Sequence, residues 1–108
     1  MSQKATNSQT ISKLFTSRKI ILDLAKNRGF NIDDYENFTI HEIQILKENK
    51  QLDMLLTNNT TGQKIYYKYH LTTKLRGPHV QDYIEDIYQV EEILTDNDDL
   101  VIVSKDQP

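Results

Sequence analysis

The fold is decided by residues 52–71, which read LDMLLTNNTTGQKIYYKYHL. The run 52–57 predicts a buried strand, and 63–71 predicts a second strand in which apolar and polar positions alternate. One face would carry Ile65, Tyr67, Tyr69 and Leu71, and the other Lys64, Tyr66, Lys68 and His70. The residues between the runs, NNTTG, tolerate a positive φ, so the two strands should form a hairpin.

After the hairpin, the sequence predicts a connection, a helix and a third strand. Gly77 and Pro78 break regular structure within residues 72–79. Apolar residues then recur at helical spacing over 80–94, with acidic residues mostly on the other side. The run LVIV at 100–103 is typical of a parallel strand covered on both faces, in the interior of a sheet. We expect a right-handed crossover from the second strand to this one.

Before the hairpin, two helices are expected. Residues 1–9 are small and polar and should form a flexible lead-in. A helix is predicted over 10–28, with Gly29 placed to end it and Arg18 on its apolar stripe, where it would snorkel or pair. That stripe comprises Ile11, Leu14, Phe15, Ile21, Leu22 and Ala25, broadened by Ile20 and Leu24.

The segment 30–38 is acidic and aromatic and reads as a connection that packs its rings inward. Those rings belong to Phe30, Tyr35 and Phe38. Thr39 and Glu42 have the spacing of a capping box, so a second short helix should begin there and run to about Asn49. The predicted order is α-α-β-β-α-β, an α/β domain with helices on a small mixed sheet.

Length and composition bound the function. The 108 residues suit one domain over 10–108, with a net charge of −3 that argues against a uniformly basic nucleic-acid binder. The chain contains no cysteine, which excludes disulfides and thiolate chemistry and fits a reducing, intracellular environment. No apolar run approaches the roughly 20 residues that span a bilayer, so no membrane partner is expected.

Few residues are candidates for catalysis. The glycines lie singly at turns, and His41, His70 and His79 lack the spacing of metal ligands. Restriction-type nucleases hold Mg²⁺ with an acid near one strand and with an acid-x-Lys triplet on the next. Asp53 and Lys68 occupy two of these positions, but Tyr66 stands where the second carboxylate is needed. We therefore predict no catalytic residue, metal or cofactor, with a divergent Mg²⁺-dependent nuclease as the alternative.

Basic residues suggest a weak nucleic-acid surface. Lys74, Arg76 and His79 lie in the connection after the second strand, and Lys105 follows the third. If both segments leave the same edge of the sheet, Lys74, Arg76 and Lys105 form a basic rim; otherwise they are scattered solvated charges. A third interpretation is a protein–protein module that uses the acidic helix 80–94.

Three segments carry a resemblance to a known family. Residues 11–38 (ISKLFTSRKIILDLAKNRGFNIDDYENF), the hairpin and residues 83–108 (YIEDIYQVEEILTDNDDLVIVSKDQP) resemble one domain. It is the N-terminal jaw domain of the fifth subunit of eukaryotic-type multisubunit DNA-directed RNA polymerases, closest to the versions carried by large cytoplasmic DNA viruses. In that family the first helix likewise ends in an Arg-Gly-aromatic turn, here Arg28, Gly29 and Phe30.

The resemblance implies a non-catalytic subunit with a restriction-endonuclease-like topology, lying beside downstream duplex DNA. Family loops that approach the DNA correspond here to 71–79 and 104–108. The implied nucleic-acid-binding residues are therefore Lys74, Arg76, Pro78, His79, Lys105 and Pro108. Lys74 and Arg76 would contact phosphates, and the prolines would stiffen their loops. Recognition should not depend on DNA sequence.

The resemblance also implies partners and a location. The partners would be the other polymerase subunits, chiefly the largest, in the nucleus or, for a viral protein, in a cytoplasmic virus factory or virion. Family members continue with another helix and strand and a C-terminal assembly domain. We therefore expect residues 10–108 to be an incomplete jaw domain with an exposed sheet edge at 100–103.

Overall fold

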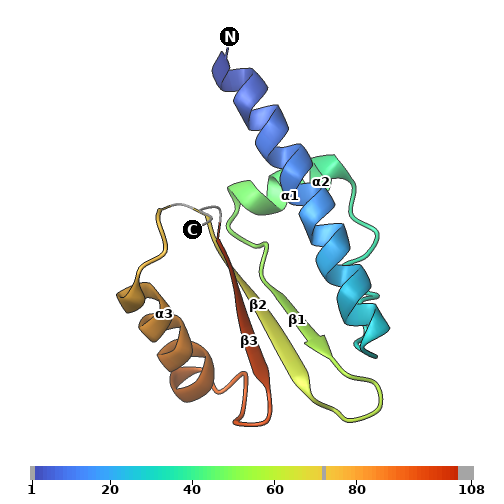
Figure 1. Ribbon diagram of the computed structural model, residues 1–108, viewed down its shortest axis with the longest axis vertical. Helices are drawn as coiled ribbons and strands as arrows, with labels where there is room; N and C mark the ends of the chain where they lie inside the picture. Colours follow the sequence, from blue (N-terminus) through green and yellow to red (C-terminus); the bar gives the residue numbers. More distant parts are fainter. Residues whose placement is uncertain (1, 72, 105–108) are drawn as a thin grey trace. The chain divides into compact units, whose positions relative to one another are not determined.

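The computed structural model describes residues 2–71 and 73–104. It is a small mixed α/β structure with a three-stranded sheet and three helices, which confirms the coarse fold class (Figure 1). Its elements are α1 (Ser2–Asn27), α2 (Ile40–Glu48), β1 (Met54–Thr57), β2 (Lys64–His70), α3 (Gly77–Ile84), the π-helix η1 (Glu85–Val90) and β3 (Asp99–Ser104). The order differs from the predicted one because η1 follows α3. The chain divides into two compact units, the first ending at Leu52 and the second beginning at Asp53.

In the first unit, α1 begins well before its predicted start. The backbone is helical from Ser2, so α1 includes residues 2–9, which precede the predicted helix start at residue 10. The helix ends as predicted, because Gly29 takes a φ of 93°, a conformation that glycine adopts without strain. The Gly29 N–H donates to the Lys26 carbonyl and the Phe30 N–H to the Ala25 carbonyl, which is a Schellman motif.

The apolar stripe of α1 is narrower than predicted. Leu14, Leu22 and Ala25 are buried, whereas Ile20 and Leu24 are 55% and 61% exposed. Of the two alternatives predicted for Arg18, the structure shows a bonded side chain and not one that snorkels to solvent. The residue is 2% exposed, and its Nη1 donates to the Leu52 carbonyl at 2.7 Å. A buried guanidinium is tolerated where such bonds replace its hydration. Of the ring-bearing connection, Phe30 is buried and Tyr35 and Phe38 are half-buried.

The second helix has the predicted capping box. The Glu42 N–H donates to Thr39 Oγ1 at 3.2 Å, and the Thr39 N–H donates to Glu42 Oε1 at 2.8 Å. Its other end closes with Lys50 at a φ of 57°, while the Gln51 N–H reaches back to the Leu46 carbonyl. A lysine therefore adopts a left-handed backbone conformation that glycine would adopt with less strain.

In the second unit, the hairpin forms as predicted. β1 and β2 are antiparallel, with Met54 opposite Tyr67 and Leu56 opposite Ile65. The turn uses Gly62 at a φ of 77° and Asn58, whose Oδ1 accepts the N–H groups of residues 60 and 61. The predicted alternation holds from Lys64 to Lys68, where Ile65 and Tyr67 are buried and the residues of the other face are half-buried. It fails after that, because Tyr69 and Leu71 are half-buried whereas His70, from the predicted polar face, is buried.

The third strand is parallel to β2, as predicted, but its position in the sheet and its burial differ from the prediction. The strand order is β1-β2-β3, so within the described residues β3 is an edge strand rather than an interior one. None of its residues is buried, and Val101 is 37% exposed. The expectation of cover on both faces is therefore wrong, whereas the expected exposed edge at 100–103 is confirmed in the described chain.

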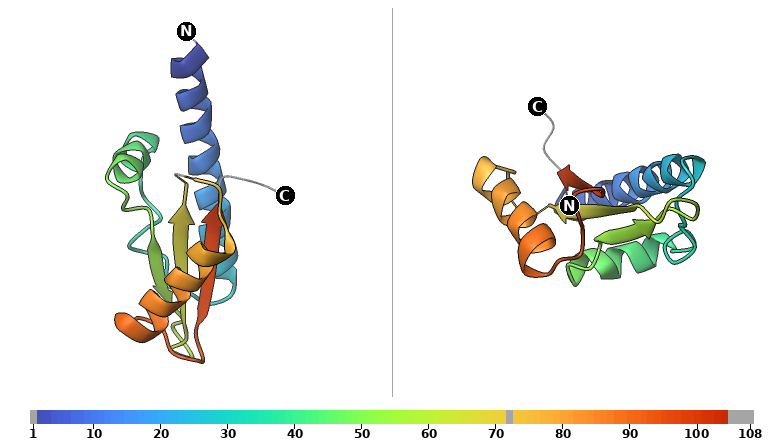
Figure 2. Two further views of the ribbon diagram at one scale, coloured as in Figure 1. Left: turned by 90° about the vertical axis from the view of Figure 1, so that its left-hand side faces the viewer. Right: turned by 90° about the horizontal axis from the view of Figure 1, so that it is seen from below.

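The helical stretch after β2 begins before residue 80 and ends before residue 94, the two predicted limits. α3 begins at Gly77 with Pro78 in its first turn, and from Glu85 the hydrogen bonding becomes π-helical through Val90. Within this unit, α3 and η1 lie along one side of the sheet (Figure 2). One contact with the sheet is made by Tyr83, whose ring packs against His70 and lies beneath the Lys68 Nζ.

At the end of the sheet where β2 and β3 begin, Asp98 ties three segments together. Its Oδ1 accepts the Lys64 N–H at 2.8 Å, and its Oδ2 accepts the Thr95 N–H at 2.9 Å and the Thr95 hydroxyl at 3.0 Å. These bonds, led by that from Lys64, hold the pKa of Asp98 below its ordinary value. The carboxylate fixes where β3 enters the sheet.

Candidate nucleic-acid interface

The two residues that the nuclease pattern shares with this chain do lie together. Asp53, just before β1, accepts hydrogen bonds on Oδ2 from the Tyr66 hydroxyl at 3.0 Å and from the Lys68 Nζ at 3.1 Å. Its Oδ1 accepts the Tyr69 N–H at 2.9 Å. Both carboxylate oxygens are therefore engaged within the hairpin, and the phenol of Tyr66 acts as a donor to the acid. This is the geometry of a structural clamp between β1 and β2.

The sheet topology places the last residues of β2 and β3 at the same end of the sheet. The two strands are parallel and His70 is in register with Ser104, so the connection after β2 begins beside the last described residue of β3. Lys74 and Arg76 are exposed there. Lys105 and Pro108 lie outside the described residues, so the basic rim of Lys74, Arg76 and Lys105 stays a prediction.

The helix start adds a positive partial charge beside those two side chains. Arg76 is the N-cap residue of α3, and its backbone N–H donates to Nδ1 of His79 at 3.1 Å. The His79 N–H is bonded to the Arg76 carbonyl and Pro78 has no N–H, so the contribution of this helix start toward anions is the positive end of its dipole. Pro78 stands in this first turn, where a missing N–H costs nothing, instead of in a loop.

Sequence reasoning missed the residue that holds this connection in place. His70 is 6% exposed; it shares a hydrogen bond through Nδ1 with the Tyr83 hydroxyl and another through Nε2 with Thr73 Oγ1 at 3.1 Å. The His79 ring lies 4.5 Å from that of His70. His79 is thus half-buried against His70 and is a support for the basic rim more than a part of its surface. The only sequence signal was His70 on the same strand face as Lys68, with Tyr83 on the apolar side of the next helix.

The sequence predicted that no metal ion is bound by the histidines. Among the residues the structure describes, no group of three or more His, Cys, Asp or Glu side chains is arranged to hold a metal ion. Nor does any helix in that part of the chain combine the length and apolarity needed to cross a membrane.

Comparisons with known proteins add no relative. No protein-family model, no curated protein and no solved structure matches the chain.

Proposed function

We propose that the chain is a non-catalytic subunit, or subunit fragment, of a multisubunit DNA-directed RNA polymerase, and that it lies against downstream duplex DNA during transcription. The observation that carries the proposal is the exposed pair Lys74 and Arg76 before and at the start of α3, in the connection that begins at the sheet end where β3 also ends. The sequence resemblance supplies the class of assembly. A restriction-endonuclease-like arrangement of the elements belongs to the same proposal.

The size of the rim determines how it would act. Each phosphate contact contributes about −0.9 to the slope of log affinity against log salt, so two contacts give a slope of roughly −2. Binding of that strength is weak and independent of sequence. It becomes useful when a larger assembly holds the domain beside the duplex, because tethering raises the effective concentration.

The Asp53 clamp supports a non-catalytic role. Both oxygens of Asp53 accept hydrogen bonds from the hairpin, which gives the carboxylate a structural role that requires no metal ion. At the position of the second acid, Tyr66 offers a phenol hydroxyl in place of a carboxylate, and that hydroxyl donates a hydrogen bond to Asp53. The same scaffold would touch nucleic acid without cutting it.

The DNA part of the proposal is tested with fluorescence anisotropy on a labelled duplex at several salt concentrations. The wild-type chain should bind weakly, with equal affinity for duplexes of unrelated sequence and a slope of roughly −2. Lys74→Gln with Arg76→Gln should remove most of the slope. Lys13→Gln with Lys26→Gln, an equal charge change on exposed residues of α1, should leave it unchanged. Equal effects of the two pairs would overturn the assignment of the rim.

The polymerase part needs the natural source. The tagged full-length gene product should copurify with the largest polymerase subunit, and its recovery without any polymerase subunit would refute the assignment. A plasmid-nicking assay with Mg²⁺ addresses the alternative. Nicking that disappears in Asp53→Asn would replace the proposal with the nuclease, and intact plasmid would favour the non-catalytic role.

A further inference from the structure

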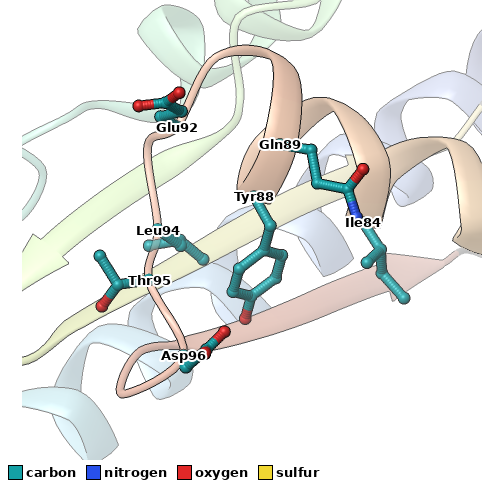
Figure 3. Close-up of a pocket in the computed structure, with 7 residues that line it drawn as sticks. All are labelled: Ile84, Tyr88, Gln89, Glu92, Leu94, Thr95 and Asp96. Carbon is teal, nitrogen blue, oxygen red and sulfur yellow. The ribbon is translucent and has the colours of Figure 1, made fainter.

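The second unit carries a groove at the opposite end of the α3–η1 stretch from Lys74 and Arg76. It lies between the helix and the segment that leads back to β3, and has a volume of about 710 Å³ (Figure 3). Its lining residues are Ile84, Tyr88, Gln89, Glu92, Leu94, Thr95 and Asp96. We call this the acidic groove, because its only charged lining residues are two carboxylates.

The backbone explains why the groove is open. The π-helical turn widens the helix, and the N–H groups of Ile93 and Leu94 both donate to the Ile87 carbonyl. Glu92 takes a φ of 53°, which reverses the chain so that residues 93–96 run back beside η1. Leu94 is then 2% exposed, while the neighbouring side chains remain accessible.

The groove combines an apolar floor with a negative rim. Tyr88 is half-buried beside Leu94, and Ile84 is 38% exposed, so apolar surface faces the opening. Glu92 and Asp96 are exposed at its margin. Figure 3 shows the Tyr88 ring directed toward the segment that bears Thr95 and Asp96.

The electrostatic environment of Tyr88 agrees with this description. Burial and then the charges of Asp99, Asp98 and Asp96 raise the pKa of its hydroxyl. The hydroxyl donates to the Asp98 carbonyl at 3.2 Å, so it is held close to these carboxylates. Negative potential therefore extends from the margin of the groove to its floor.

We propose that the acidic groove binds a short basic, amphipathic segment of a partner protein. An apolar side chain of that segment would pack on the accessible surfaces of Ile84 and Tyr88, and its Lys or Arg side chains would face Glu92 and Asp96. Charge complementarity selects this occupant: nucleic acid has the wrong sign, and a second copy of the chain would bring a net charge of −3. The proposal is independent of DNA binding, because it uses a different surface.

The probe is a labelled peptide, Gly-Lys-Arg-Leu-Leu-Lys-Arg-Gly amide, followed by backbone amide NMR shifts. We expect shifts concentrated in residues 84–96. A matched peptide with glutamine at every basic position should bind at least about fivefold more weakly, as expected from a few solvent-screened charge pairs. A second peptide with serine in place of leucine should also bind more weakly, because the apolar floor then loses its partner.

Matched variants separate the groove from general acidity. Glu92→Gln with Asp96→Asn should weaken binding of the basic peptide about fivefold. Asp33→Asn with Asp34→Asn, an equal charge change on exposed residues of the first unit, should alter it less than twofold. Shifts spread over all acidic segments, equal losses in the two variants, or equal affinity for the glutamine peptide would each overturn the proposal. Salt-dependent DNA binding is measured separately, so either result stands without the other.

Discussion

Replacing Asp98 with asparagine should destabilise the second unit by about 1–2 kcal/mol at neutral pH. The carboxylate accepts three hydrogen bonds, two of them from the backbone of Lys64 and Thr95. Bonds to an ionised acceptor contribute about 1.5–3 kcal/mol each when buried, and less at a half-exposed site such as this. Asparagine keeps one acceptor oxygen and turns an amide group toward a donor, so at least one bond is lost.

The effect should depend on pH in a defined direction. The pKa of Asp98 is lowered in the folded chain, first by the Lys64 N–H bond, from an ordinary value of 3.8. A lowered folded pKa means that the stabilisation is fully present above about pH 4 and is lost as the pH falls through the folded value. Wild type and variant should therefore converge in stability at acidic pH.

Hydrogen exchange of the Lys64 amide measures this locally. Exchange in Asp98→Asn should be roughly 5- to 30-fold faster at pH 7, the factor that corresponds to 1–2 kcal/mol. Urea unfolding at pH 7 and pH 3 gives the pH dependence. Asp96→Asn, an equal charge change at an exposed neighbour, should change stability by less than about 0.5 kcal/mol. Equal losses in the two variants, or a loss in Asp98→Asn that persists undiminished at pH 3, would refute the reasoning.

Two further predictions concern the ends of α2. Thr39→Ala removes the side chain that caps the Glu42 N–H and should cost about 1 kcal/mol, seen as faster amide exchange in the first turn; unchanged exchange would mean that the cap does not stabilise the helix. Lys50→Gly relieves a left-handed residue and should raise stability by about 0.5–1 kcal/mol in urea unfolding. Asn49→Gly, at a φ of −90°, should give no such gain, and equal gains would contradict the strain argument.

The parts of the fold that followed from the sequence are those with local causes. The Thr39 capping box is set by residues three apart, and the hairpin by alternation on either side of a turn-forming segment. The start of α1 was missed because residues 2–9 lack apolar periodicity, which is the signal that the prediction relied on.

Errors in the second unit arose from non-local causes. An apolar run such as LVIV indicates a strand but not the position of that strand in the sheet. Within the described chain β3 pairs only with β2, so it lies at the edge of the sheet. The way the chain leaves η1 depends on hydrogen bonds to the Ile87 carbonyl and on the left-handed Glu92. Neither feature can be recognised from residue types. Hydrogen bonds to a backbone carbonyl leave no pattern in the sequence, and a residue with such a φ is usually glycine, not glutamate.

The candidate site divides in the same way. Asp53 and Lys68 were paired in the prediction because the hairpin places them on neighbouring strands, and the structure joins them at 3.1 Å. The Tyr69 N–H that completes the clamp is a backbone group and has no sequence signature. His70, Tyr83 and His79 come together only through the crossover, so no spacing along the chain could announce their contact.

The charges at the two ends of the α3–η1 stretch are arranged against helix stability. A helix dipole favours acids in the first turn and bases in the last, each by about 0.3–1 kcal/mol. Here exposed Lys74 and Arg76 flank the start of α3, whereas Glu91 and Glu92 follow the end of η1. Local charge choices that oppose the fold are expected where a surface serves binding. The same inversion therefore supports an anionic partner at one end of the stretch and a cationic one at the other, which is what the basic rim and the acidic groove are proposed to bind.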